Sequence, residues 1–355
     1  RKSKDQKIQT AFLSESASKN TFLENLSVWI RGNFFIPDAR KSWIKPSVKF
    51  LSKYVTENTI DIIVTTGPPH SMHMIGYHLK KKLNISWLAD FRDPWTNIDY
   101  YQQLRLGKRA DRMHHKLEQA VLTKADAVTV VSPGMIRDFK AKVERDYFFI
   151  PNGYDKADVK DGNKIIKSAK FTLSHIGSLT KTRNPENLWR AMQELVSENK
   201  QFEKDLEIKN IGKIDFSAIE SLNRAGLEKY LTSINYLPHN QVIDEQKSAS
   251  LLLLLINDTP NAKLILTGKI FEYLATATPI ICIGPVDGDA ANIIRNKKCG
   301  EVFDFNEIRS LKSHLEEAYK KFKKKKLISD CQNTYEFERK NLTGKMAEVL
   351  GHIKE

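Results

Sequence analysis

Short apolar runs alternate with amphipathic segments through the first half of the chain. Residues 59–66 (TIDIIVTT) form a mostly β-branched run that ends at Gly67-Pro68-Pro69, and residues 71–83 carry apolar positions at helical spacing. Such runs are typical of strands buried in a parallel sheet, and the segments between them predict crossover helices. Further strands are predicted at 85–90, 127–131 and 147–150, and further helices at 42–58 and 104–124. The alternation indicates a doubly wound α/β lobe.

The pattern restarts after a polar stretch at residues 156–170. Residues 251–256 (LLLLLI) are entirely apolar and predict a central strand. The chain of 355 residues has room for about two domains. We therefore predict an α/β fold with two Rossmann-like lobes built on parallel sheets, residues 1–155 and 156–332, and a last helical segment in 333–355. The other strands of the second lobe are predicted at 172–176, 206–211, 232–237, 279–283 and 302–305.

Composition narrows the class of protein. Hydrophobic residues make up 41% and charged residues 28%, which is typical of a globular chain. No apolar run approaches the ~20 residues that span a bilayer, and no signal peptide is visible, so we expect a cytoplasmic protein. Cys282, Cys299 and Cys331 lie far apart without a C-x-x-C pair. They predict reduced thiols rather than a disulfide or zinc framework.

The chain carries a net charge of +14 and should attract anions. A nucleic-acid partner is not expected, because basic and aromatic residues do not interleave on any predicted strand. The densest basic run is at residues 320–326 (KKFKKKK). It is interpreted either as a solvated helix face or as a docking site for an anionic membrane surface.

The clearest candidate for chemistry lies before the predicted strand 279–283. Gly268 precedes a predicted helix, Lys269 opens it, and Glu272 lies one turn further along. The free N–H groups of a helix start suit a phosphate, Lys269 adds positive charge, and Glu272 can accept hydrogen bonds from ribose hydroxyls. An ordinary capped helix would also explain the pattern.

Several segments together resemble glycosyltransferases of the two-lobed GT-B fold, of the family 4 type. The central one is the segment 269–281 (KIFEYLATATPII), which is similar to the donor-site segment of that family. The remaining similar segments are 150–155 (IPNGYD), 175–179 (HIGSL), 284–291 (GPVDGDAA), 66–71 (TGPPHS) and 89–95 (ADFRDPW). The last two resemble acceptor-lobe loops of bacterial members that build surface polysaccharides.

The resemblance implies roles for residues of the second lobe. Glu272 would bind the donor ribose, and Lys269 would lie near the diphosphate with Gly268 at the helix start. The glycine after the first strand is Gly177, but Ser178 stands where the family has an arginine. Charge would then come from Lys181 or Arg183, with Arg183 preferred.

Two further positions depend on the same resemblance. Leu237 follows a predicted strand at the place of the family's base-binding loop. Leu264 stands where the family has the first glutamate of its E-x7-E motif, so contact with the donor sugar would pass to Asp258 or Asn261.

In the first lobe, charged residues gather where predicted parallel strands end. His70 follows Gly-Pro-Pro and is a candidate base or hydrogen-bond donor, and Asp90, Arg92 and Asp93 follow the next strand. Ligands bind beyond the carboxyl ends of such strands, so these four residues are candidates for an acceptor or catalytic site. An Arg–Asp pair that only locks the loop is the alternative. His114-His115 is interpreted as a surface pair.

The resemblance implies a transferase that moves a sugar from a nucleotide-sugar to a glycan or lipid-linked acceptor, with retention at the anomeric carbon, without a cofactor and without a required metal. It also implies that the last helix crosses back to the first lobe. The family's first lobe opens with a strand and a glycine-rich loop, and neither precedes residue 59. The first strands are therefore expected to be absent, in which case the chain would bind donor and transfer sugar poorly. Alternative functions are a nucleotide-sugar epimerase of the same fold and a non-enzymatic bilobal binding protein.

Overall fold

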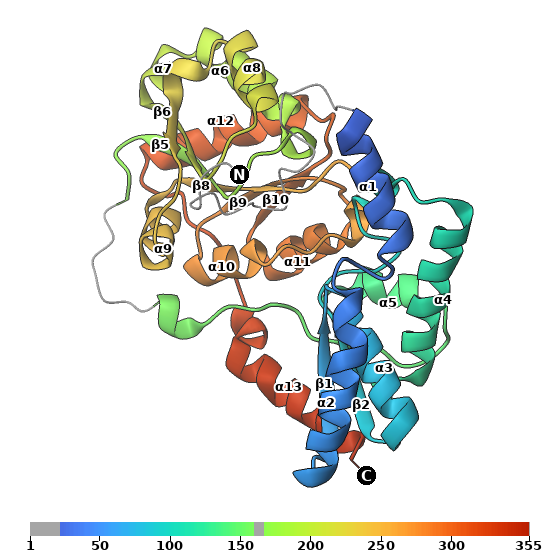
Figure 1. Cartoon of the computed structure of the whole chain (residues 1–355). Coiled ribbons are helices and arrows are strands. Elements are labelled where there is room, and N and C mark those ends of the chain that lie inside the picture. The colour runs from blue at the N-terminus through green and yellow to red at the C-terminus, as the bar shows by residue number, and fades with distance from the viewer. Residues whose placement is uncertain (1–21, 160–166, 355) are drawn as a thin grey trace.

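The first lobe is organised around a parallel sheet. In the computed structural model, which describes residues 22–159 and 167–354, its four described strands lie in the order β1-β2-β3-β4 (Figure 1). The buried residues of these strands, Trp87 and Phe91 among them, form the core with Phe139. The strands are β1 (Ile62–Gly67), β2 (Ser86–Phe91), β3 (Ala127–Val130) and β4 (Phe148–Phe149). The helices are α1 (Phe22–Phe34), α2 (Ile44–Glu57), α3 (Ser71–Leu83), α4 (Lys108–Lys124) and α5 (Pro133–Lys140).

The second lobe is organised around a parallel sheet whose six described strands lie in the order β10-β9-β8-β5-β6-β7. The chain starts at β5 in the middle and builds outward in both directions, which makes the gap between β5 and β8 the switch point of the sheet. The strands are β5 (Phe171–Ile176), β6 (Leu206–Ile211), β7 (Leu231–Ile234), β8 (Leu251–Leu255), β9 (Ile280–Ile283) and β10 (Gly300–Phe303). The helices are α6 (Glu186–Glu198), α7 (Lys200–Asp205), α8 (Phe216–Arg224), α9 (His239–Ser248), α10 (Lys269–Thr276), α11 (Asp289–Lys297) and α12 (Arg309–Lys323).

Both sheets arise from the predicted strands. The five leucines of β8 are all buried, because helices cover both faces of a parallel sheet. Hydrophobic clusters lie on both sides of this strand, one around Leu253 and one around Leu254. The predicted α/β fold with two Rossmann-like lobes is confirmed.

The last helix, α13 (Arg339–His352), returns to the first lobe as predicted (Figure 1). Its Leu342 and Val349 pack with Leu88, Ala127 and Ile150 on the face of the first sheet. The chain therefore passes between the lobes twice, once before β5 and once before α13. The two passages meet at a bridge between Tyr154 and Glu338.

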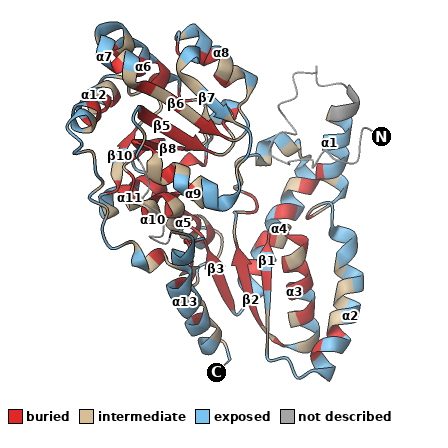
Figure 2. Ribbon diagram, turned by 90° about the vertical axis from the view of Figure 1, so that its left-hand side faces the viewer, coloured by how far each residue is buried: buried red, intermediate tan, exposed pale blue. Residues whose placement is uncertain are grey.

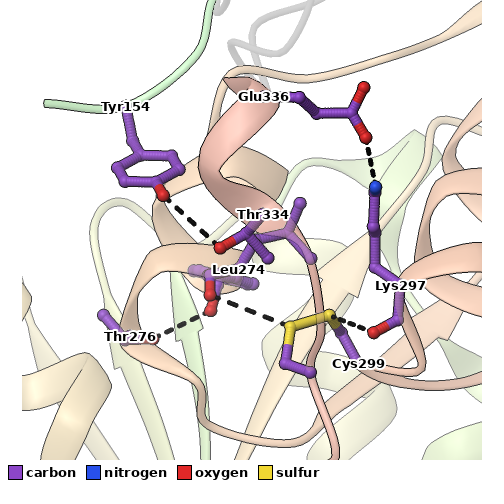
Figure 3. The surroundings of a disulfide bond; sticks show 9 residues. Tyr154, Leu274, Thr276, Lys297, Cys299, Thr334 and Glu336 are labelled. Carbon is purple, nitrogen blue, oxygen red and sulfur yellow. Dashed lines mark hydrogen bonds and ion pairs between the residues drawn. A yellow bond between two sulfur atoms is a disulfide. The ribbon is translucent and has the colours of Figure 1, made fainter. Parts of the chain in front are cut away.

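Two expectations from the sequence are wrong. Cys299 and Cys331 form a disulfide, with their Cα atoms 4.3 Å apart, while Cys282 is buried and free (Figure 3). The two cysteines are 32 residues apart in sequence. The chain between them folds back and brings them together, and the sequence spacing of the cysteines does not indicate this contact. Of the histidine pair predicted at the surface, His115 is exposed, whereas His114 is buried and its Nδ1 accepts a hydrogen bond of 3.0 Å from the Trp95 indole.

Candidate donor and acceptor site

Two glycine turns shape the donor side of the candidate site. Gly177 follows β5 with φ +116°, and Gly212 follows β6 with φ +136°, and side chains rarely adopt such values. A Cβ on Gly177 would lie 2.1 Å from Nζ of Lys269, and one on Gly212 would lie 2.4 Å from the carbonyl oxygen of Gly177. The carboxyl ends of two neighbouring strands thus leave room for the lysine tip between them.

Lys269 is the first residue of α10, and keeping its ammonium group charged in this buried position costs free energy. Burial lowers the pKa of its ammonium from 10.5 to about 8, and the positive charge of Arg183 adds to the shift, while Glu272 opposes it. A cation held in this way is stabilised by an arriving anion, which would remove much of the penalty. Arg183 is directed by a hydrogen bond from its Nε to the side chain of Asn257.

Two polar atoms near these cations have no hydrogen-bond partner within the described part of the chain. They are the hydroxyl of Thr267, two residues before α10, and Nε2 of His175 in β5. His175 is fully buried, and burial followed by the nearby charge of Lys269 lowers its pKa to about 3. The imidazole is therefore neutral, and its Nδ1 donates a hydrogen bond of 3.1 Å to the carbonyl oxygen of Leu253. Buried polar atoms without partners are uncommon, and the charge of Lys269 acts on one of these two, the His175 ring.

Glu272 lies one turn into α10, and its side chain reaches toward the passages between the lobes. The carboxylate accepts a hydrogen bond of 3.2 Å from Gln246 of α9. It also lines a small cavity with Tyr154 and Asp155 of the first passage and Arg339 of the second. Glu272 is half-buried, so its remaining lone pairs face this space rather than the core.

The other predicted donor residues are placed less uniformly. Gly268 caps α10, and a Cβ there would lie 3.6 Å from the side chain of Asn152, at the start of the linker. Lys181 is exposed, and Ser178 is half-buried in the same loop. Leu237 packs half-buried against the core beneath α10. The structure thus brings Gly177, Lys269 and Arg183 together, and leaves Lys181 in solvent.

Leu264, which stands at the place of the missing glutamate, and Asn261, one of its two proposed replacements, lie at the junction of the lobes. Leu264 packs against Gly134 of α5, where a Cβ would lie 2.4 Å from its Cδ2 atom. The amide of Asn261 donates to the carbonyl of Asn97 at 2.9 Å. Asp258 is exposed. Asn261 therefore holds the first lobe, and Asp258 remains available to a ligand.

On the acceptor side, His70 closes the loop after β1. It is buried and stacks on Trp95 with ring centroids 4.5 Å apart and an interplanar angle of 2°. Its Nδ1 has no hydrogen-bond partner among the described residues. Burial, followed by the proximity of His73, holds the pKa of His70 well below 6.5. A neutral imidazole of this kind can accept a proton or hydrogen-bond a hydroxyl.

Asp90 and Arg92 form the loop-locking pair that the sequence left as an alternative. Asp90 accepts hydrogen bonds from Thr129 of β3 at 2.8 Å and from Thr66 of β1 at 3.3 Å. Arg92 lies 3.5 Å from the Asp90 carboxylate and also donates to the side chain of Asn152. These contacts join three strand ends to the linker between the lobes.

Asp93 differs from its neighbours. Burial and the nearby carboxylate of Asp99 raise its pKa from 3.8 to about 6, and Arg92 opposes this shift. A carboxyl group poised near neutral pH in a loop beyond parallel strands is a frequent feature of functional sites.

A network across the lobes was missed by sequence reasoning. Asp289 opens α11, and its buried carboxylate accepts from the Gly134 amide at 2.6 Å and from Arg137 at 3.1 Å. Asp99 of the first lobe accepts from Asn257 at 2.6 Å, and Asn257 in turn holds Arg183. Arg183, the cation beside Lys269, is thus connected to Asp99 of the first lobe through the side chain of Asn257. Asp289 lies inside the segment 284–291 that carries the resemblance, but its partners come from another lobe and no local pattern indicates them.

Comparison with known proteins places this arrangement among described folds. Neither a protein-family model nor a curated protein sequence matches the chain. A glycosyltransferase of Rickettsia africae superposes over 87% of this chain and 81% of its own, with a TM-score of 0.66 and 14% identity. Anabaena HepE, solved in complex with UDP-glucose, covers 86% of this chain and 82% of its own, with a TM-score of 0.63 and 15% identity.

An enzyme of another reaction class shares the architecture. A protein of Listeria monocytogenes assigned as a UDP-N-acetylglucosamine 2-epimerase covers 88% of this chain and 79% of its own, with a TM-score of 0.53 and 10% identity. Identities this low establish architecture and leave the reaction open. The chain therefore has the two-lobed GT-B fold that the sequence resemblance predicted.

Proposed function

We propose that the chain is a glycosyltransferase that moves a sugar from a nucleotide-sugar to a glycan or lipid-linked acceptor. The observation that carries the proposal is the position of Lys269, buried over Gly177 at the start of α10 with Arg183 beside it. A diphosphate placed there would meet two cations at the positive end of the α10 dipole, where the amides of Ile270 and Phe271 donate to the carbonyls of Thr267 and Gly268. The neighbours that are glycosyltransferases, one of them solved with UDP-glucose, support the same class of donor.

In the proposed reaction, the bond between the anomeric carbon and the diphosphate oxygen breaks as a bond to an acceptor hydroxyl oxygen forms. The leaving diphosphate takes the electron pair, and Lys269 and Arg183 stabilise the charge that develops on it. The acceptor proton passes to His70, to Asp93 or to the leaving diphosphate. Retention at the anomeric carbon and a role in surface-polysaccharide synthesis belong to the proposal through the family 4 resemblance. So does a reaction that needs no metal.

A donor screen tests the proposal. Among UDP-, GDP-, ADP- and dTDP-sugars at saturating concentration, we expect at least one to raise the melting temperature by a few degrees, since a ligand at 100 times its Kd adds about 2.7 kcal/mol. The Glu272→Ala variant should lose this response, because the ribose hydroxyls lose their acceptor. The Glu220→Ala variant, which changes an exposed glutamate of α8, is the control and should keep it. A complete absence of response would contradict donor binding.

The epimerase is the second candidate, favoured by the neighbour from Listeria. Analysis of products distinguishes the two reactions. A transferase releases a nucleoside diphosphate in step with a new glycoside on the acceptor, whereas an epimerase changes the sugar without needing an acceptor. Nucleotide-sugar conversion that does not depend on an acceptor would favour the epimerase.

Proton uptake on donor binding follows from the pKa of Lys269. The free lysine is mostly neutral at about pH 9, and a bound diphosphate should restore its pKa toward 10.5, so binding takes up nearly one proton at about pH 9 and close to none at about pH 7. Affinity should therefore fall as the pH rises above about 8. Calorimetry in buffers of different ionisation enthalpy measures the uptake. It should disappear in Lys269→Met and persist in Lys263→Met, which changes an exposed lysine of the same lobe. Equal uptake in both variants would assign the proton to another group.

The site of action is proposed as the cytoplasmic face of an anionic membrane, with the chain attached at the surface. No helix in the described part of the chain is long and apolar enough to cross a bilayer. The Cys299–Cys331 disulfide argues against this compartment, because disulfides are rare in the cytosol.

The basic run at 320–326 is partly neutralised, since Lys320 pairs with Glu316 and Lys321 with Glu317. Another surface is better suited to the membrane.

A further inference from the structure

Large apolar side chains are concentrated on the outside of the first lobe. In Figure 2, α1 and α2 run along the outer margin of this lobe, away from the second sheet, and much of α2 is coloured as exposed. Phe50 is 67% exposed, Phe34 58% and Trp43 52%. We call the exposed aromatic and basic residues of this region the α1–α2 surface. They are Trp29, Arg31, Phe34, Phe35, Arg40, Lys41, Trp43, Lys45, Lys49, Phe50, Lys53 and Tyr54.

The aromatic and basic members of the α1–α2 surface contact one another. Trp29 packs edge-on against Phe34 with centroids 5.7 Å apart, and Phe50 stacks with Tyr54 at 6.2 Å. Arg40 lies over Trp43, with its guanidinium carbon 5.2 Å from the ring centroid. The α1–α2 surface thus contains both ring–ring pairs and cation–ring pairs, the latter including Lys41 over Phe35 at 5.7 Å.

This surface is held firmly by the lobe beneath it. Between α1 and α2, the Asp38 carboxylate accepts from the amide of Ser71, the first residue of α3, at 2.7 Å. Asn33 of α1 accepts from the Gly107 amide at 2.7 Å. The inner face of α2 buries Val55 against α3. These contacts attach α1, α2 and the segment between them to the first lobe.

The charge of the surface is strongly positive. Residues 31–53 contain six basic side chains and a single acidic one, Asp38. The Asp38 carboxylate accepts a hydrogen bond from the Ser71 amide. Lys45, Lys49 and Lys53 follow one another at four-residue spacing and so share one side of α2. Within the part of the chain that the structure describes, Lys53 alone among these three forms an ion pair, an exposed one at 3.6 Å to Glu57.

The residue types of the α1–α2 surface indicate what kind of partner it binds. The centres of protein–protein interfaces are depleted in lysine, whereas four of the six basic residues here are lysines. Aromatic rings beside lysines suit the interface of a bilayer, where rings enter the headgroup layer and ammonium groups pair with lipid phosphates. We propose that the α1–α2 surface docks the first lobe on an anionic lipid bilayer.

The docked orientation has a consequence for the acceptor. Asp38 lies in sequence between Phe35 and Arg40 of the α1–α2 surface, and its carboxylate contacts Ser71, the residue after His70. The acceptor side of the site therefore lies next to the part of the lobe that meets the lipid. A lipid-linked acceptor would reach His70 without leaving the membrane. This inference rests on the proposed membrane attachment and not on the transferase chemistry.

Vesicle sedimentation with the whole chain tests the proposal. We expect binding to vesicles of phosphatidylcholine with about 30% phosphatidylglycerol and little binding to pure phosphatidylcholine. The Lys45→Glu/Lys49→Glu/Lys53→Glu variant should bind at least about 100-fold more weakly, from the contribution of each surface lysine. The matched control is Lys324→Glu/Lys325→Glu/Lys326→Glu, which makes the same charge change in the second lobe and should bind nearly as the parent does. Loss of binding in the control alone, or in neither variant, would overturn the proposal.

Tryptophan fluorescence supplies a readout that is specific to the surface. Of the five tryptophans, Trp87, Trp95 and Trp189 are buried, so a blue shift on addition of vesicles reports Trp29 and Trp43. The shift should be roughly halved in Trp43→Ser. Sedimentation with vesicles but without a spectral shift would place the contact elsewhere and overturn the proposal.

Two other occupants would also overturn it. One is a second copy of the chain, revealed by a concentration-dependent dimer without lipid that Phe50→Ser abolishes. The other is nucleic acid, revealed by tighter binding to duplex DNA than to anionic vesicles at equal salt. The donor-induced rise in melting temperature, measured on the same lysine variants, separates the two proposals. Vesicle binding without any donor response leaves this inference standing while the proposed transferase fails.

Discussion

Replacing Lys269 with methionine should lower kcat/KM for sugar transfer by about 10²–10³-fold, the usual cost of removing one group that stabilises charge in the transition state. Methionine keeps the length and apolar contacts of the lysine stem, so the fold should be retained. Because the buried ammonium carries a penalty in the free protein, the variant should also unfold no more easily than the parent at neutral pH.

The measurement is initial-rate kinetics with the donor that the melting-temperature screen identifies, beside urea unfolding of both proteins. The control is Lys263→Met, whose exposed lysine pairs with Asp287 and should leave kcat/KM within about twofold. A loss in Lys269→Met that is matched by a loss of stability would point to a structural role. An unchanged kcat/KM would remove Lys269 from the site.

Substituting Gly177 with alanine should weaken donor binding by about 100-fold or more. The residue has φ +116°, and the new methyl group would lie 2.1 Å from the Lys269 ammonium and 2.6 Å from its Cε. The lysine tip would have to leave the loop, and the backbone would be strained by about 1–3 kcal/mol. Donor titration calorimetry measures the first effect and urea unfolding the second.

Gly344 provides the matched control. It lies in α13, and a Cβ there would meet nothing within 4 Å, so Gly344→Ala should leave donor affinity unchanged and add about 0.5–1 kcal/mol to stability. The double variant Gly177→Ala/Lys269→Met tests the mechanism further. If alanine acts by displacing the lysine, the two losses of affinity will not add. Full additivity would mean that Gly177 acts independently of Lys269.

The fold was largely predictable because it depends on local pattern. The strand β8 is an apolar run and β6 alternates apolar and polar residues, and the structure places both within one or two residues of the prediction. The last segment differed only in detail, since the helical segment predicted in 333–355 begins with a short 3-10 turn at Thr334–Phe337 before α13.

The candidate site was predictable only where its residues are neighbours in sequence. Gly268, Lys269 and Glu272 occupy one helix start, so their spacing indicated a shared role. The position of Lys269 over Gly177 depends on how β5 and α10 meet, and nothing in either segment alone reveals it.

Contacts between distant segments account for what the sequence could not show. Asp90 and Arg92 are candidate site residues in sequence, and the structure adds contacts to Thr129 and Asn152 that the sequence does not indicate. Cys331 meets Cys299 because the chain turns back before α13. In each case the deciding partner lies far away in the sequence.

A crystal structure of the protein with a bound nucleotide-sugar tests the central claim most directly. We predict diphosphate oxygens within hydrogen-bond distance of the Lys269 ammonium and of the first amides of α10, with a ribose hydroxyl on the carboxylate of Glu272. A nucleotide bound away from Gly177, or Lys269 and Glu272 contacting only protein at saturating ligand, would contradict it.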